Sequence, residues 1–259
     1  MDGPCAGGEV GASYVRWPDG RRSVLTWMPD TAVADLRAGP FAVVDAVRAV
    51  GYPAPATELA VQIGSDVAIV QELLPGVKVD RLDLRGLEQV LELNTLQAGR
   101  FAGRDDVTAV NLYLSGDGPG FCLHEPLRRH SRRGAALERW VTSVAREYPE
   151  CSNGDDAVHV DFHPGNMLAR DGVITGVVDW DGAGRGDRSL DLVTLRFGVH
   201  AGGADQDVVR RLDAILDAMP RNALRPAWAH MSLRMADWAI RHHSPDSVEQ
   251  WFDLAEQRV

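Results

Sequence analysis

The feature that most constrains the fold is a hairpin signal between two clusters of polar residues. Asp171 and Gly172 form a dipeptide typical of a two-residue turn, and they separate the runs MLAR and VITGVVDW, of which the second is rich in β-branched residues. A hairpin folds the chain back on itself. We therefore expect Asn166, just before the first arm, to lie beside Asp179, near the end of the second.

The polar side chains around this hairpin are the groups that phosphoryl transfer requires. Asp161 can accept the proton of a hydroxyl, and Asn166 with Asp179 offers an amide oxygen and a carboxylate for Mg²⁺. His159, Asp161 and His163 alone would favour a structural loop, and they could also form a transition-metal site. Together with Asn166 and Asp179 they favour a phosphotransferase site.

Composition bounds the class of protein. The chain has 259 residues, 45% of them hydrophobic and 25% charged, which predicts a folded chain of one domain or one two-lobed domain. No apolar run reaches the ~18 residues that span a bilayer, and the N-terminus lacks the features of a secretion signal. We therefore expect a cytoplasmic protein with no membrane partner. Cys5, Cys122 and Cys151, odd in number and widely spaced, predict neither a disulfide framework nor a zinc site.

The formal net charge of −10 argues against a nucleic-acid partner, because binding a polyanion requires a basic surface. The same charge suits a cationic substrate, since an acidic cleft would attract it. Solubility alone explains a mildly acidic chain equally well.

The pattern changes along the chain from strands to helices. Up to residue 76 it alternates and is rich in turn residues, whereas from Arg81 onward apolar residues recur at helical spacing. We expect an α+β fold with a small β-rich lobe, 1–76, and a larger, mainly helical lobe, 77–259. The expected elements are strands in 12–17, 23–27, 59–64 and 66–76, helices near 41–50, 84–96 and 137–148, and three helical segments after Leu192 that are broken at Pro220 and at Ser244-Pro245.

The segments HVDFHPGNML and VVDWDGAGRGDRSLDL resemble the aminoglycoside phosphotransferase family, whose members have a two-lobed protein-kinase-like fold. The resemblance implies that Asp161 is the catalytic base and that His159 supports its loop. It implies that Asn166 and Asp179 hold Mg²⁺, and that ATP or GTP binds between the lobes.

The resemblance also implies a set of nucleotide contacts, with one departure from the family. Thr26 stands where the family has a lysine that holds the phosphates, and Asp45 is only a loose candidate for the partner of that lysine. Lys78, the only lysine in the chain, lies too far along to be its equivalent by position. Binding would then depend on backbone groups, Mg²⁺ and arginines. The residues assigned to the nucleotide are Gly8, Gly11, Ser13, Thr26, and, in the segment between the lobes, Gln71, Glu72 and Leu74.

For the acceptor, the resemblance implies a hydroxyl of a cationic antibiotic, either an aminoglycoside or a tuberactinomycin peptide. The short chain and its arginine usage are most similar to the viomycin and capreomycin phosphotransferases. Asp181, Asp187 and Asp237 are the candidate residues on the substrate side. We expect a monomer or a weak dimer.

Three alternatives stay open at this point. A metabolic kinase for a small molecule such as choline or homoserine would share the chemistry and differ in the pocket. A nucleotide-binding pseudokinase is motivated by Thr26. A hydrolase would use His159, Asp161 and His163 on a transition metal.

Overall fold

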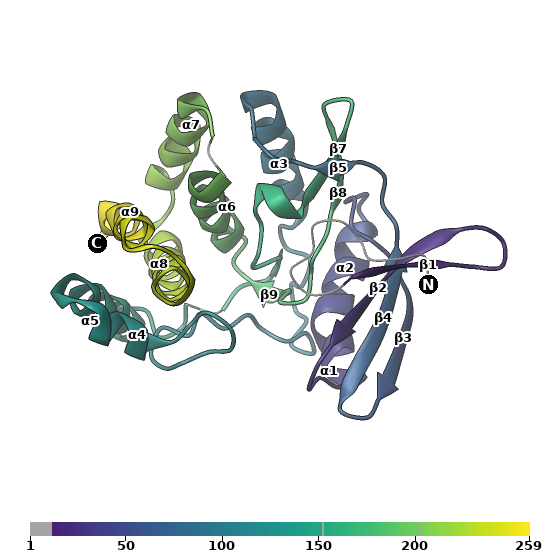
Figure 1. The fold of residues 1–259 in the computed structure, drawn as a ribbon, viewed down its shortest axis with the longest axis horizontal. Helices are drawn as coiled ribbons and strands as arrows, with labels where there is room; N and C mark the ends of the chain where they lie inside the picture. Colours follow the sequence, from purple (N-terminus) through teal and green to yellow (C-terminus); the bar gives the residue numbers. More distant parts are fainter. Residues whose placement is uncertain (1–11, 152, 203) are drawn as a thin grey trace.

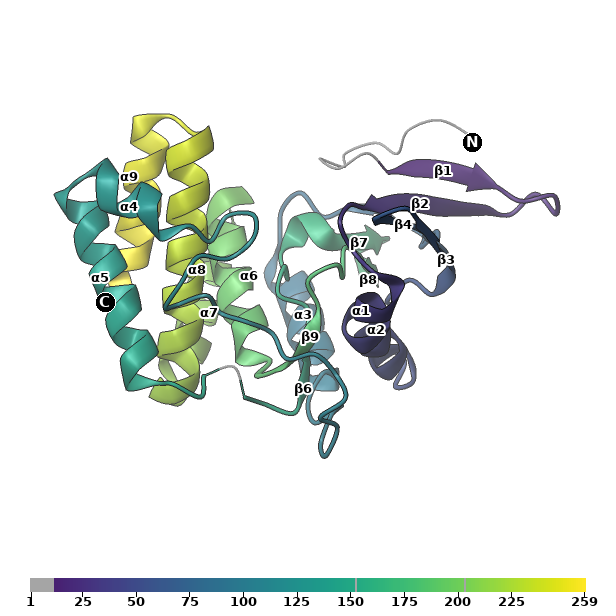
Figure 2. The ribbon, with the colours of Figure 1, turned by 90° about the horizontal axis from the view of Figure 1, so that it is seen from below.

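The computed structural model describes residues 12–151, 153–202 and 204–259. A small β-rich lobe lies beside a larger helical lobe, as both ribbon views show (Figure 1 and Figure 2). Gly8 and Gly11, which the sequence assigns to the nucleotide, lie outside the described residues, as does Cys5.

The small lobe is built on a four-stranded antiparallel sheet in the spatial order β1-β2-β4-β3. Its strands are β1 (Ser13–Arg16), β2 (Arg22–Met28), β3 (Thr57–Ile63) and β4 (Asp66–Glu72). The predicted strands are therefore confirmed. Between β2 and β3 lie helices α1 (Val33–Ala38) and α2 (Pro40–Arg48), of which only α2 was expected from the sequence.

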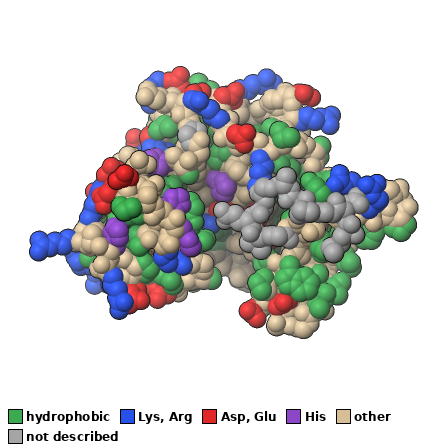
Figure 3. Space-filling model, viewed as in Figure 1, with side chains coloured by type: hydrophobic (Ala, Val, Ile, Leu, Met, Phe, Trp, Pro, Cys, Tyr) green, Lys and Arg blue, Asp and Glu red, His purple; other side chains and the backbone are tan. Residues whose placement is uncertain are grey.

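The two faces of this sheet differ. Val67 and Ile69 of β4 point to one face, where they pack against Leu36 of α1 in a small buried cluster. On the other face the side chains of Trp27, Leu59, Val61 and Ile63 are 40–51% exposed. Figure 3 shows hydrophobic side chains gathered on the surface of this lobe. The core of the lobe therefore lies on the helix side of the sheet.

The helical lobe is centred on α8 (Arg221–His242), which contacts α4, α5, α6 and α9. The other helices are α3 (Leu84–Leu96), α4 (His124–His130), α5 (Arg132–Glu147), α6 (Ser189–Gly202), α7 (Gln206–Asp217) and α9 (Pro245–Ala255), followed by the 3₁₀ turn η2 (Glu256–Arg258). The three helices predicted after Leu192 are confirmed as α7, α8 and α9. The sequence did not predict α6, because this helix is buried on nearly every side and so lacks an amphipathic pattern.

The hairpin expected at Asp171 is confirmed. It joins β7 (Met167–Arg170) to β8 (Val173–Val177), and the turn residues Asp171 and Gly172 have φ values of 54° and 74°. Two positive φ angles are what a type I′ turn requires, and Asp-Gly adopts them readily. Strand β5 (Val77–Lys78) extends this hairpin to three strands, and β6 (Asp156–Val158) pairs separately with β9 (Gly184–Gly186).

The two lobes share one cluster of buried hydrophobic residues. Val43 and Val47 of α2 belong to the same buried cluster as Phe162, Met167 and Trp180 of the larger lobe. The fold thus connects the small lobe directly to the loop and hairpin that carry Asp161, Asn166 and Asp179. Within the described ranges, no helix is long and apolar enough to cross a membrane.

Candidate active site

The loop after β6 is held in an unusual backbone conformation by one buried carboxylate. Val160 has a φ of 74°, a left-handed value that β-branched residues rarely adopt. Asp191 of α6, which is fully buried, accepts the N–H of His159 at Oδ2 and the N–H of Val160 at Oδ1, both at 2.8 Å. The Gln97 amide donates to the same carboxylate at 2.6 Å. Asp191 therefore fixes the start of the loop.

His159 supports the loop as a neutral, fully buried imidazole. Its Nε2 donates to the carbonyl of Val178 at 2.9 Å, and its Nδ1 accepts the N–H of Asp161 at 3.2 Å, which assigns the tautomer. Its ring lies 4.4 Å from that of Trp180. Burial lowers the pKa of His159 to about 4. Since both nitrogens are engaged, the transition-metal triad does not form, and no three His, Cys, Asp or Glu side chains of the described part of the chain gather to hold a metal.

Asp161 is the ionised carboxylate at the centre of the site, with a third of its side chain exposed. Its Oδ2 accepts the Asn166 amide at 2.9 Å and lies 3.4 Å from Nε2 of His163, while Oδ1 accepts Nη2 of Arg234 at 2.8 Å. Burial acts to raise the pKa of Asp161, but the His163 contact and the Arg234 charge hold it well below its usual range. Asp161 can therefore accept a hydrogen bond from a hydroxyl at neutral pH.

Asn166 and Asp179 are brought together as the hairpin predicts. The N–H of Val178 donates to the Asn166 carbonyl at 2.9 Å, and Asp179 follows directly with a φ of 67°. The Asn166 amide nitrogen is used by Asp161, while no described residue donates to its Oδ1. Burial raises the pKa of Asp179, and the negative charge of the Asp161 carboxylate raises it further. An amide oxygen beside such a carboxylate fits Mg²⁺, a hard cation with oxygen ligands.

The three aspartates assigned to the substrate lie in different environments. Asp181 reaches the surface two residues beyond Asp179, yet partial burial and the Asp179 charge raise its pKa to about 6. Asp237 is fully buried and accepts the N–H of Leu123 and the guanidinium of Arg241. Of these three, only Asp181 is open to a ligand at the site.

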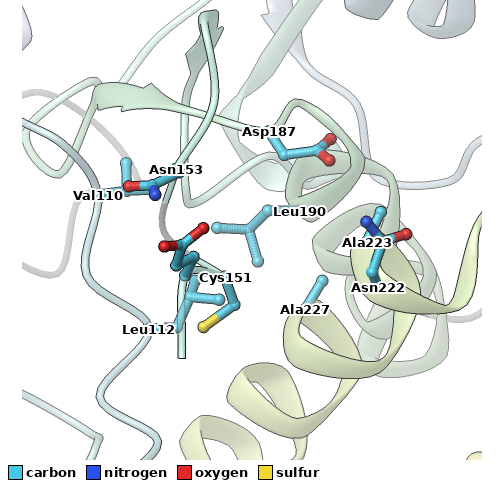
Figure 4. Close-up of a pocket in the computed structure, with 10 residues that line it drawn as sticks. Val110, Leu112, Cys151, Asn153, Asp187, Leu190, Asn222, Ala223 and Ala227 are labelled. Atoms are coloured by element: carbon cyan, nitrogen blue, oxygen red, sulfur yellow. The ribbon is translucent and has the colours of Figure 1, made fainter. Parts of the chain in front are cut away.

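Asp187 caps α6 by accepting the N–H of Ser189 at 2.8 Å. It lines a cavity of about 90 Å³ together with Leu112, Cys151 and Asn222 (Figure 4). None of the residues that line this cavity belongs to the loop of Asp161 and Asn166. The structure therefore does not bring Asp187 to the loop of Asp161.

Of the residues assigned to the nucleotide, Ser13, Thr26, Gln71, Glu72 and Leu74 are described, and they lie along the small lobe and the link. Ser13 opens β1, and Thr26 of β2 pairs with Ile69, its buried Oγ1 meeting no hydrogen-bond partner among the described residues. Gln71 and Glu72 end β4, where Glu72 binds Arg48 at 2.9 Å.

The link itself runs close above the hairpin. An added Cβ at Gly176 would meet the Leu74 side chain at 2.8 Å, so Leu74 packs on the hairpin. Lys78 of β5 stands opposite Leu168 of β7, and its charge partly offsets the raised pKa of Asp179.

The sequence did not point to Arg234, and it gave Asp191 no defined role. Arg234 lies 73 positions from Asp161 and carries no local motif, so nothing in the sequence could have found it. Asp191 belongs to the noted GDRSLDL segment, which was the available signal for its role.

The segments that carry this geometry match a known family. A model described as the phosphotransferase enzyme family matches residues 4–234. The chain belongs to this family. No curated protein is similar enough in sequence to match this phosphotransferase-family protein.

Solved structures of similar fold cover nearly the whole chain. A thermostable mutant of aminoglycoside phosphotransferase APH(4)-Ia aligns with a TM-score of 0.64 at 17% identity, covering 98% of this chain and 91% of that chain. Aminoglycoside phosphotransferase APH(3'')-Id from Streptomyces rimosus, in complex with ADP and streptomycin, aligns with a TM-score of 0.55 at 19% identity, covering 87% and 92%. The expected two-lobed, protein-kinase-like fold is confirmed.

Proposed function

We propose that this phosphotransferase-family protein transfers the γ-phosphoryl group of ATP, or of GTP, to a hydroxyl of a cationic antibiotic. The observation that carries the proposal is an ionised, oriented Asp161 beside the oxygen ligands of Asn166 and Asp179. A carboxylate that orients a hydroxyl beside a metal-ligand pair is the arrangement that phosphoryl transfer requires.

Each residue of the group has a defined task. Asp161 receives the acceptor hydroxyl, orients its oxygen toward the phosphorus and takes its proton. Asn166 and Asp179 hold Mg²⁺, which when bound neutralises charge on the transferred phosphoryl oxygens. His159 and Asp191 keep the loop in place through the backbone bonds at 159–161.

On the nucleotide side, the proposed lobes are 1–76 and 77–259, with the link near Gln71 and Leu74 against the adenine. Thr26 brings no charge to the phosphates, so the positive charge has to come from elsewhere. Lys78 is the candidate, since its charge acts on Asp179 from the larger lobe.

The proposed acceptor is an aminoglycoside or a tuberactinomycin peptide such as viomycin or capreomycin. The net charge of −10 and the accessible Asp181 support a cationic acceptor. The similar structures named for hygromycin B and streptomycin complexes support an antibiotic. We propose that the protein acts in the cytoplasm, where ATP is available, as a monomer or weak dimer.

The test is ATP and GTP turnover with Mg²⁺ across aminoglycosides, viomycin, capreomycin, macrolides, choline and homoserine. The wild type is compared with Asp171→Asn, a control substitution of an exposed turn aspartate on the same hairpin, where Asn tolerates the positive φ. The proposal predicts turnover with one antibiotic class in the wild type and in Asp171→Asn. Turnover with only choline or homoserine would identify a metabolic kinase instead.

A second candidate function is a nucleotide-binding pseudokinase, which the uncharged Thr26 favours. That alternative predicts that nucleotide binds with Mg²⁺ while no acceptor in the panel is phosphorylated. Calorimetric titration of the protein with AMP-PNP, run beside the turnover assay, separates it from the enzyme.

A further inference from the structure

Arg234 reaches the catalytic carboxylate from helix α8. Its Nη2 donates to Oδ1 of Asp161 at 2.8 Å and its Nη1 donates to the Val160 carbonyl at 3.1 Å. The side chain keeps 24% of its surface exposed. A cation thus stands beside the oxygen that is to receive the acceptor hydroxyl.

The next arginine along the same helix, Arg241, forms an ion pair with a residue of that helix. Arg241 binds the buried Asp237 through Nε and Nη2, at 2.7 and 2.9 Å, and lies over the ring of Phe121 at 5.2 Å. The charge of Arg241 is therefore neutralised by Asp237, a residue that has no task in the proposed reaction. The partner of Arg234 is Asp161 itself, so an incoming acceptor meets both members of this pair.

The geometry leaves Arg234 able to contact a ligand. A guanidinium has five N–H donors, and the two bonds to Asp161 and Val160 use two of them. A hydroxyl bound to Asp161 lies about 3 Å from its carboxylate oxygen. The substituent on the neighbouring carbon of the acceptor then falls within reach of the same guanidinium.

We propose that Arg234 determines specificity by binding the acceptor substituent next to the reacting hydroxyl, and that this substituent is an oxygen group and not an ammonium. Hydroxyl, carbonyl or carboxylate oxygens accept the free donors, whereas an ammonium there meets a like charge in a partly buried site. A cationic acceptor therefore turns its amino groups away from α8. This inference rests on the proposed phosphotransferase function.

The first test separates acceptor binding from nucleotide binding. Arg234→Gln and Arg234→Lys are compared with Arg225→Gln, a matched control on α8 whose side chain is 21% exposed and pairs with Glu147 at 3.6 Å. Loss of the charged donors predicts an acceptor KM raised about tenfold in Arg234→Gln, partly restored in Arg234→Lys, with the nucleotide KM within about twofold. An unchanged or lower acceptor KM would overturn the inference.

A binding measurement tests the inference apart from turnover. D-glucuronate and D-glucosamine are titrated calorimetrically into protein loaded with Mg²⁺ and AMP-PNP. The inference predicts about tenfold tighter binding of glucuronate, with the ratio lost in Arg234→Gln and kept in Arg225→Gln. Equal binding, or tighter binding of glucosamine, would contradict it. Absent turnover on every acceptor would count against the proposed function and leave this binding result to decide the inference.

Discussion

At the residue scale, the site depends on a carboxylate that is buried in the core. Asp191 is 0% exposed and holds the loop through the N–H groups of His159 and Val160. Burial raises its pKa to about 6, against the opposing effect of these hydrogen bonds. Asp191 is therefore mostly ionised at neutral pH, and its charge strengthens the bonds that keep Val160 at positive φ.

Replacing Asp191 with Asn should destabilise the protein and reduce activity together. The amide offers one acceptor oxygen where the carboxylate uses two, so one donor is left unsatisfied at a cost of about 2 kcal/mol. Urea unfolding of Asp191→Asn at pH 7 measures the loss, with Asp171→Asn as the exposed control. A change below about 0.5 kcal/mol, within the range of surface substitutions, would show that Asp191 does not hold the loop.

The site residues that could be predicted are those that lie close together along the chain. Asp161, Asn166 and Asp179 are joined by one hairpin, whose turn type its own dipeptide determines, so their neighbourhood followed from local sequence. Arg234 joins them only through the packing of α8. Asp237 was assigned to the substrate, whereas the structure buries it in an ion pair with Arg241. A helical pattern does not reveal such an ion pair.

At the element scale, the link between the lobes is fitted closely to the hairpin. Gly76 has a φ of 120°, and an added Cβ would lie 2.6 Å from Oγ1 of Thr175 and 2.9 Å from the Ala169 carbonyl. Strand β4, which leads into the link, was predictable from its alternation. Helix α6 was not, because uniform burial removes the amphipathic signal, and α1 was not, because six residues are too few to establish a period.

Gly76→Ala should therefore loosen the link. The substitution meets both a disfavoured φ and a backbone clash, so we expect a loss of about 2 kcal/mol and weaker nucleotide binding. The control is Gly64→Ala, where φ is 65° but no atom lies within 4 Å of the added Cβ. It should cost only about 1 kcal/mol from the backbone. Thermal unfolding measures the loss of stability, and AMP-PNP titration measures the nucleotide affinity. Equal effects of Gly76→Ala and Gly64→Ala would refute the close fit of the link to the hairpin.

At the scale of the whole molecule, the core contains a histidine that resists protonation. His230 of α8 is 2% exposed, and its Nδ1 donates to the Leu112 carbonyl at 2.6 Å. Burial lowers its pKa to about 4. The unfolded chain binds a proton at about pH 6.5, so the contribution of His230 to stability is present above that pH and is lost as the pH falls toward 4.

His230→Gln should reduce this acid sensitivity, whatever its effect at pH 7. Gln keeps an N–H donor for Leu112 and does not titrate. Between pH 6 and 4.5 the free energy of unfolding of His230→Gln should therefore fall less steeply than that of the wild type. The two slopes should differ by at most about 1.4 kcal/mol per pH unit. Urea unfolding at several pH values measures both slopes. Parallel slopes would mean that His230 does not titrate differently on unfolding.

The phosphoryl transfer proposed for the whole molecule depends on the carboxylate of Asp161. The most direct measurement is the turnover of Asp161→Asn with Mg²⁺, ATP and the acceptor found in the panel, beside AMP-PNP titration of the same protein. We predict that kcat falls by about 10²–10⁴, as for loss of a general base, while nucleotide affinity changes less than about threefold. Wild-type turnover in Asp161→Asn would contradict the mechanism.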